Sequence, residues 1–284
     1  TGAEKGMPAV VCSNLVFSDA DKRDASLKKA YADGLIRPYV VLERSGLKVG
    51  VFALIGRRAA ESAPFARPVK FGDPFRTAQT MVNMLRNDEK VDLVICLSYG
   101  GLNLDDPQQI KGDDVELAKR VTGINVIVGG HTHTLCPKPQ QVRGTLIVQA
   151  GAYGAHVGVM DLTVEGGKAT LARYDMVAVD AGIAGDPAVQ IMVDQAIDQL
   201  NRLVLAEKGL HYYKMLAKSR FDLTLEPRDS NLGNMVTDAI RWSIDRAERD
   251  KSGRRTDVAF ESLGLIGDDI LKGMNRSLTV ADCF

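Results

Sequence analysis

The stretch GINVIVGGHTHTL, residues 123–135, holds a run of branched apolar residues that ends in two glycines and a pair of histidines. A second apolar run, VDLVICLSY (residues 91–99), precedes it, and a short helical pattern opening at Asp113 and Asp114 separates the two. The run at 91–99 is apolar enough to form a strand buried on both faces, which is typical of parallel sheets. This order of strand, helix and strand predicts an α/β domain.

The residues before this unit extend the same pattern. AVVCSNLVF (residues 9–17) predicts a buried strand, and YVVLERSGLKVGVFALIG (residues 39–56) predicts a hairpin that turns at Ser45 and Gly46. Asp73 and Pro74 are an N-cap and first-turn signal for a helix. The first domain therefore begins with strands that helices connect.

The pattern changes after Thr145, where strands follow one another without helices between them. TLIVQAG begins at Thr145, and residues 156–165 and 168–180 form a strand pair joined at Gly166 and Gly167. Two facing sheets with outer helices would accommodate this order.

A connecting helix and a second unit follow. The helix begins at Asp186 and Pro187 and has a narrow apolar stripe, which suits packing along a domain surface. A second amphipathic helix is expected from about Asn231 to Arg249. We predict a first domain over residues 1–182, a connecting helix over 183–210 and the start of a C-terminal domain over 211–284.

Composition narrows the possible partners. The 36 basic and 36 acidic side chains balance, so no overall field favours a nucleic-acid polymer or an anionic membrane. No apolar run approaches the ~20 residues of a membrane span, and the first residues lack the regions of a signal peptide. The four cysteines show no C-x-x-C spacing and are read as buried apolar residues.

The histidine pair is the main candidate site. His131 and His133 are expected in the loop at the carboxyl end of a strand, where α/β sheets place ligands. Gly129 and Gly130 would supply the backbone freedom that a tight loop needs. Two neutral imidazoles can bind zinc, manganese or iron, but they make only half of a tetrahedral site. The alternative is that one histidine caps a backbone group and the other faces water.

Two parts of the chain together resemble one known family. VDLVICLSYGG, DDVELAKRV and GINVIVGGHTH (within residues 91–133) resemble the later part of the calcineurin-like metallophosphoesterase domain, in its bacterial 5'-nucleotidase branch. DSNLGNMVTDAI (residues 229–240) resembles the signature that opens the C-terminal 5'-nucleotidase domain. The resemblance covers most of the chain.

This resemblance implies a fold and a site. The fold would be a partial α/β/β/α two-sheet sandwich, followed by the linker helix and by part of an α+β C-terminal domain. Two divalent metal ions, of zinc, manganese or iron, would lie between the sheets, with His131 and His133 each binding one and an acceptor group fixing each ring. The reaction would be metal-dependent hydrolysis of phosphate monoesters, 5'-nucleotides above all, by an intact parent protein in the periplasm or cell envelope.

The chain also departs from the family pattern. By this resemblance the chain begins where the family resumes after its Asp-x-His, Gly-Asp and Gly-Asn-His blocks, so we expect it to lack the bridging carboxylate and the catalytic histidine that those blocks hold. The fourth block, normally Leu-Ser-His-x-Gly, reads LSYGG, with Tyr99 in place of a metal-binding histidine. A phenol has a pKa near ~10, so Tyr99 is either a lost ligand or, with ferric iron, a tyrosinate ligand. We therefore expect a truncated chain that is inactive alone, and assign no catalytic residue.

The C-terminal unit departs as well. Residues 262–267 read SLGLIG where the family has an asparagine and an arginine that bind the nucleotide. Loss of that guanidinium removes a strong phosphate contact. Two alternatives consequently stay open. One is a related hydrolase acting on a cyclic nucleotide, a nucleotide sugar or a sulfur-linked ester, and the other is a non-catalytic binding protein on a decayed scaffold.

Several other polar residues complete the set of candidates. His156 is expected near the same sheet edge, and Asp105 or Asp106 could approach the histidine loop. His211 is expected to be structural or interdomain. The pair Asn231 and Asn234 can be explained by capping and packing at the start of their helix.

Overall fold

The computed structural model describes residues 8–106, 109–226, 229–248, 255–266, 269–271 and 276–283. The chain divides into two compact units, residues 1–183 and 184–284. The finer division into a first domain, a connecting helix and a C-terminal domain remains a prediction.

A six-stranded mixed sheet is the centre of the first unit. In spatial order its strands are β4 (Tyr39–Arg44), β5 (Leu47–Ile55), β7 (Leu93–Tyr99), β8 (Val126–Gly129), β10 (Thr145–Val148) and β9 (Gln140–Val142). The four central strands β5, β7, β8 and β10 run parallel, whereas β4 and β9 pair antiparallel at the two edges. The carboxyl ends of the four parallel strands consequently lie at one edge of the sheet.

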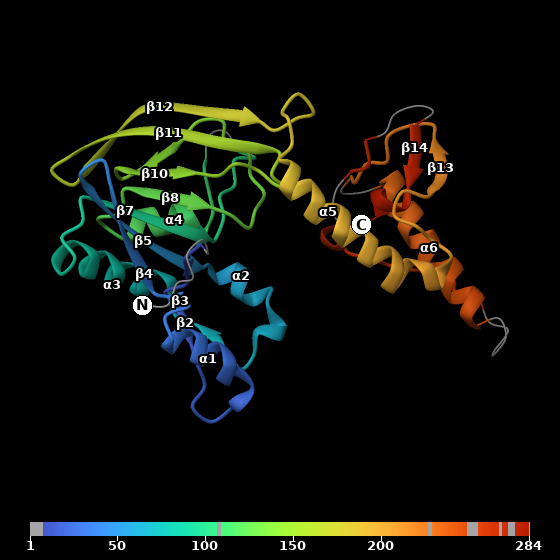
Figure 1. Cartoon of the computed structure of the whole chain (residues 1–284), viewed down its shortest axis with the longest axis horizontal. Coiled ribbons are helices and arrows are strands. Elements are labelled where there is room, and N and C mark those ends of the chain that lie inside the picture. Colours follow the sequence, from blue (N-terminus) through green and yellow to red (C-terminus); the bar gives the residue numbers. More distant parts are fainter. Residues whose placement is uncertain are drawn as a thin grey trace. The chain divides into compact units, whose positions relative to one another are not determined.

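Different layers cover the two faces of this sheet (Figure 1). Helices α3 (Pro74–Asn87) and α4 (Asp113–Arg120) pack on one face and form the main core with Phe52, Val94 and Ile127. The hairpin of β11 (His156–Glu165) and β12 (Lys168–Ala178) packs on the other face. The expected mixed α/β class is confirmed, and the described layers are helices, sheet and hairpin.

The hairpin covers only part of its face. Met160, Leu162 and Tyr174 pack on Val126 and its neighbours in β10, but β7 is left partly open. Leu97 is 41% exposed and Tyr99 is 50% exposed. The prediction that residues 91–99 are buried on both faces was therefore wrong for this end of the strand, because the two-stranded hairpin does not reach it.

The predicted buried strand over residues 9–17 is also wrong. Two short strands replace it, β1 (Val10–Val11), which pairs with β3 (Ile36–Arg37), and β2 (Leu15–Val16), which pairs with β6 (Lys70–Phe71). Asn14 separates β1 from β2 because its buried amide accepts from the N–H of Ile55 and donates to the carbonyls of Ile55 and Gly72. A side chain committed to these backbone groups ends the extended run.

Local signals placed several other elements correctly. The turn at Ser45 and Gly46 joins β4 to β5 with both residues at positive φ, as a two-residue hairpin requires. Asp73 caps α3 by accepting from the N–H groups of Phe75 and Arg76, both at 3.0 Å. The remaining short helices of this unit are α1 (Ala25–Ala32) and α2 (Arg57–Glu61).

The second unit contains two longer helices and a strand pair. Helix α5 (Pro187–Leu200) begins at the Asp186 cap, and α6 (Asn231–Glu248) matches the second predicted helix within the described residues. Strand β13 (Met215–Ser219) pairs antiparallel with β14 (Arg276–Thr279). Within the described part of the chain, no helix has the length and apolar content of a membrane span.

Candidate metal site at the sheet edge

The candidate site lies where the four parallel strands end. Strand β7 ends at Tyr99, β8 at Gly129 and β10 at Val148, so the loops that follow them share one edge of the sheet. This edge is where α/β sheets place ligands. The structure therefore puts both predicted metal ligands, His131 and His133, at this edge, and the ring of His131 lies against that of Tyr99.

The histidine loop has an unusual backbone. His131 has φ 73° and His133 has φ 56°, so both adopt the left-handed conformation that side chains other than glycine rarely take. Thr132, between them, is anchored by its hydroxyl, which accepts from the N–H of Leu102 at 3.1 Å and donates to the Leu102 carbonyl at 2.8 Å. The loop is thus tied to the segment that follows β7.

Gln149 is a second anchor of this loop. The side-chain amide of Gln149 is oriented so that its oxygen and its nitrogen both have hydrogen-bond partners. The oxygen accepts from the N–H groups of His133 and Thr134, each at 3.0 Å, and the nitrogen donates to the Thr132 hydroxyl at 3.1 Å. Gln149 is buried, so these bonds satisfy a side chain that would otherwise be costly to bury. Gln149 was not among the predicted site residues, although a polar residue directly after the apolar strand TLIV was an available signal.

The expected role of the two glycines needs correction. Neither Gly129 nor Gly130 has a positive φ, so neither supplies the backbone freedom that was predicted. Gly129 is needed for space instead, because a Cβ there would lie 2.5 Å from Oδ2 of Asp114. A Cβ on Gly130 would lie 3.2 Å from the ring of Tyr99, which is a tight contact.

Asp114 lies directly beneath the loops at this edge. It is fully buried, and its Oδ1 accepts from the Ser98 hydroxyl at 2.5 Å. Its Oδ2 has no hydrogen-bond partner among the described residues. Burial raises the pKa of Asp114 to about 6, and the hydrogen bond from Ser98 opposes that rise only in part. From the sequence, Asp114 was predicted only as part of a helix start.

Each histidine ring contacts a tyrosine. The rings of Tyr99 and His131 are 5.0 Å apart, and those of His133 and Tyr153 are 5.3 Å apart. Each imidazole was expected to donate a hydrogen bond to an acceptor group that fixes its orientation. Within the described part of the chain, neither ring makes a hydrogen bond. Tyr153 was also missed, since its place in the chain has no metal-ligand spacing.

The described residues fit only part of a two-metal centre. No group of three or more histidine, cysteine, aspartate or glutamate side chains that could hold a metal occurs among them. Asp105 and Asp106 line a cavity together with His131, but they add no such group. Two imidazoles can contribute to a metal site, and further ligands would have to come from outside the described residues.

The candidate residues of the second unit have local partners. His211 accepts from the N–H of Tyr213 at 3.3 Å and lies 3.1 Å from the Asn201 amide, which supports a structural role. Asn231 accepts from the N–H of Thr224 at 2.6 Å and Asn234 donates to Asp229 at 2.9 Å.

The remaining sequence candidates lie apart from any described ligand group. His156 begins β11 near Gly151, and Gly151 belongs to the loop that follows β10. Residues 262–266 include a short 3-10 turn, Leu263–Leu265. Gly267, the last residue of SLGLIG, lies outside the described residues.

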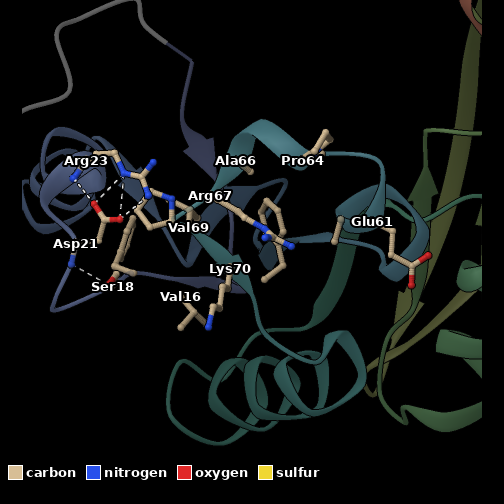
Figure 2. Close-up of a pocket in the computed structure, with 15 residues that line it drawn as sticks. Val16, Ser18, Asp21, Arg23, Glu61, Pro64, Ala66, Arg67, Val69 and Lys70 are labelled. Carbon is tan, nitrogen blue, oxygen red and sulfur yellow. Dashed lines mark hydrogen bonds and ion pairs between the residues drawn. The ribbon is translucent and has the colours of Figure 1, made fainter.

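A larger cavity of about 920 Å³ lies elsewhere in the first unit and has no histidine among its lining residues (Figure 2). Figure 2 shows the ion pair of Arg23 and Asp21 on its lining, with the shortest contact at 2.6 Å. Arg67, Lys70 and apolar residues of the 60–71 segment form much of its remaining wall. This cavity is separate from the histidine loop.

Comparisons with known proteins find relatives in sequence and in fold. The trifunctional nucleotide phosphoesterase protein YfkN of Bacillus subtilis is 29% identical over 247 residues, which are 81% of this chain and 16% of that protein. A 5'-nucleotidase of Vibrio vulnificus is 27% identical over 174 residues, which are 54% of this chain and 32% of that protein. No protein-family model matches the chain.

A solved structure is similar over nearly the whole chain. The 5'-nucleotidase precursor of Thermus thermophilus matches 96% of this chain and 51% of its own, with a TM-score of 0.68 and 28% identity. These relatives and this solved structure support a 5'-nucleotidase-like metallophosphoesterase family for the chain. The chain spans about half or less of each relative named here.

Proposed function

We propose that this chain contributes to a metal-dependent enzyme that hydrolyses phosphate monoesters of nucleotides. The observation that carries the proposal is the presentation of His131 and His133 at the sheet edge, in a loop fixed by Thr132 and Gln149. The names of the relatives, a nucleotide phosphoesterase and 5'-nucleotidases, support the substrate class. The family resemblance also implies export to the cell envelope, which remains a prediction.

The roles of the chain's own residues follow from their chemistry. His131 and His133 would provide imidazole nitrogens to divalent metal ions, which polarise a phosphate ester and supply a hydroxide nucleophile when bound. Gln149 would hold the backbone of the loop so that both imidazoles stay at the edge. Because two imidazoles are too few ligands for a stable centre, we propose that this chain alone binds metal weakly and shows little hydrolysis.

Metal titration of the 284-residue chain tests both parts of this proposal. We expect weak binding of Mn²⁺ or Zn²⁺ by calorimetry, lost in the His131→Ala, His133→Ala double variant and retained in His211→Ala. We expect phosphate release from a nucleoside monophosphate to stay near the buffer rate. Metal binding that survives the double substitution would disprove the ligand role. Rapid metal-dependent hydrolysis lost in that variant would disprove the predicted inactivity.

A non-catalytic binding protein is the second candidate function. Tyr99 stands where the family has a metal-binding histidine, and its ring contacts His131. Elemental analysis separates the two functions. Metal that co-purifies with the intact native protein supports the hydrolase, whereas its absence from native and metal-supplemented preparations supports the binding protein.

A further inference from the structure

The larger cavity of the first unit, shown in Figure 2, is lined by two segments, residues 16–23 and 60–71. The pairing of β2 with β6 joins these segments. The volume of about 920 Å³ lies in the range of small-molecule sites, about 300–1,000 Å³. No residue of the histidine loop is among those that line it, so a ligand here would not occupy the candidate metal site.

Most of the lining is apolar. Nine of the fifteen lining residues are apolar, and two of these, Phe17 and Phe71, are aromatic. Phe65, which lies between the lining residues Pro64 and Ala66, is 97% exposed. Ligand pockets combine such apolar walls with a few polar groups that orient the ligand. The apolar body of a ligand would be removed from water here, which favours binding.

The charged residues of the lining have a net charge of +1. Three are basic, Arg23, Arg67 and Lys70, and two are acidic, Asp21 and Glu61. Arg23 and Asp21 neutralise each other, because the guanidinium lies 2.6 Å and 3.0 Å from the two carboxylate oxygens. Figure 2 shows Glu61 at the end of the lining away from this pair.

Two of the basic side chains remain available to a ligand. Arg67 and Lys70 are exposed, and neither side chain makes a hydrogen bond or ion pair within the described part of the chain. The same holds for Glu61, so two uncommitted cations stand against one uncommitted carboxylate. This excess favours a ligand with one negative charge.

We infer that this cavity binds a small organic anion that combines an apolar body with one carboxylate. The planar guanidinium of Arg67 matches both oxygens of a carboxylate, and the ammonium of Lys70 adds a second cationic donor. A carboxylate also matches the net charge of the lining, whereas a phosphate monoester carries about two negative charges. This ligand site is separate from the histidine loop and goes beyond the hydrolysis proposed there.

Binding of matched naphthalene probes by the 284-residue chain tests this site. We expect 2-naphthoate to bind about tenfold more tightly than 2-naphthylmethanol, which has the same apolar body without the charge, since two exposed cations should contribute about threefold each. Acetate, which has the carboxylate without the apolar body, should bind more weakly than both. Calorimetry measures the affinities, and the amide chemical shifts of Ser18 and Val69 report binding in the cavity.

Substitution of the two cations separates the charge from the apolar wall. Arg67→Gln and Lys70→Gln should each weaken 2-naphthoate binding about threefold and leave the affinity for 2-naphthylmethanol unchanged. Circular dichroism should show both variants folded, because neither side chain has a described bond to lose. The matched controls Arg44→Gln and Lys168→Gln remove exposed cations that do not line the cavity, and they should bind both probes like the unaltered chain.

Equal affinity of the unaltered chain for the two naphthalene probes would overturn the inference. A loss shared by the controls, or unchanged chemical shifts of Ser18 and Val69, would overturn it as well. The double variant His131→Ala, His133→Ala should bind 2-naphthoate like the unaltered chain, and a loss in that variant would place the probe at the histidine loop instead. The assay contains no metal, so this site and the proposed function can fail separately.

Discussion

Asp114 shows how one buried residue shapes the loops around it. Its carboxylate occupies the space that side chains at Gly100 and Gly129 would need, with a Cβ 2.8 Å and 2.5 Å from its oxygens. Gly100 belongs to the LSYGG motif and Gly129 to the VGGHTH motif. These two glycines leave space for the buried carboxylate of Asp114. The same burial raises the pKa of Asp114 to about 6, so its protonation state changes near that pH.

The Asp114→Asn variant should change how stability depends on pH. The pKa of Asp114 rises from 3.8 to about 6 on folding, so the folded state holds the proton more tightly. Its stabilising contribution is complete below about pH 4 and is lost as pH rises through about 6. Two pKa units correspond to about 3 kcal/mol. Urea unfolding from pH 4 to 7 should show the variant gaining stability by up to about this amount relative to the unaltered chain.

The control for this prediction is Asp161→Asn, on the exposed side of β11. Its unfolding free energy is measured over the same pH range, as a reference for the removal of one exposed carboxyl group. A constant difference between the Asp114→Asn variant and the unaltered chain from pH 4 to 7 would contradict the raised pKa.

At the scale of elements, the β11–β12 hairpin is fixed to the sheet by a polar cluster at its turn. Arg86 of α3 donates to Asn125 at 2.6 Å and to the carbonyl of Gly167 at 3.2 Å. The Asn125 amide donates to the same carbonyl at 3.0 Å and accepts from the N–H of Val94 at 2.8 Å. Helix, sheet and hairpin thus meet at one buried amide, at the end of β7 opposite Tyr99.

The Asn125→Ala variant should weaken the hairpin attachment. It would leave the buried N–H of Val94 without its acceptor and remove one acceptor of Arg86, so we expect a loss of roughly 2–4 kcal/mol in unfolding free energy. Amide hydrogen exchange in β11 and β12 should rise. Asn103→Ala, which removes an exposed amide, should change stability by less than about 0.5 kcal/mol. Unchanged exchange in the hairpin would show that packing alone holds it.

At the scale of the whole molecule, the chain consists of two units joined near residue 183. The segment 180–185 lies between β12 and α5, is exposed throughout and contains Gly182 and Gly185. Such a segment is where proteolysis usually begins. The two units therefore have a junction that a protease can reach without unfolding either one.

Limited digestion with thermolysin, which cleaves before large apolar residues, should produce a fragment that begins at Ile183. Mass spectrometry identifies this fragment, and Ile183→Asp should suppress it while leaving other cleavages unchanged. Cleavage within the strands of the six-stranded sheet before any cleavage at 180–185 would contradict an accessible junction.

The sequence by itself determined the elements with strong local signals. Capping at Asp73, the turn at Ser45 and Gly46, and the alternation of strand and helix from residue 91 all depend on neighbours in the chain, so they were predicted correctly. The same holds for the position of His131 and His133 in a loop at the end of a strand. Local chemistry decides these features before distant contacts form.

Only the tertiary structure decided the surroundings of these elements. Asn14 interrupts the predicted first strand through bonds to residues 41 and 58 positions away, and the limited reach of the hairpin leaves Tyr99 exposed. Asp114 reaches the histidine loop from α4, and Gln149 and Tyr153 reach it from the loop that follows β10. No spacing rule in one sequence encodes such contacts, because they depend on how the parallel strands bring their carboxyl ends to one edge.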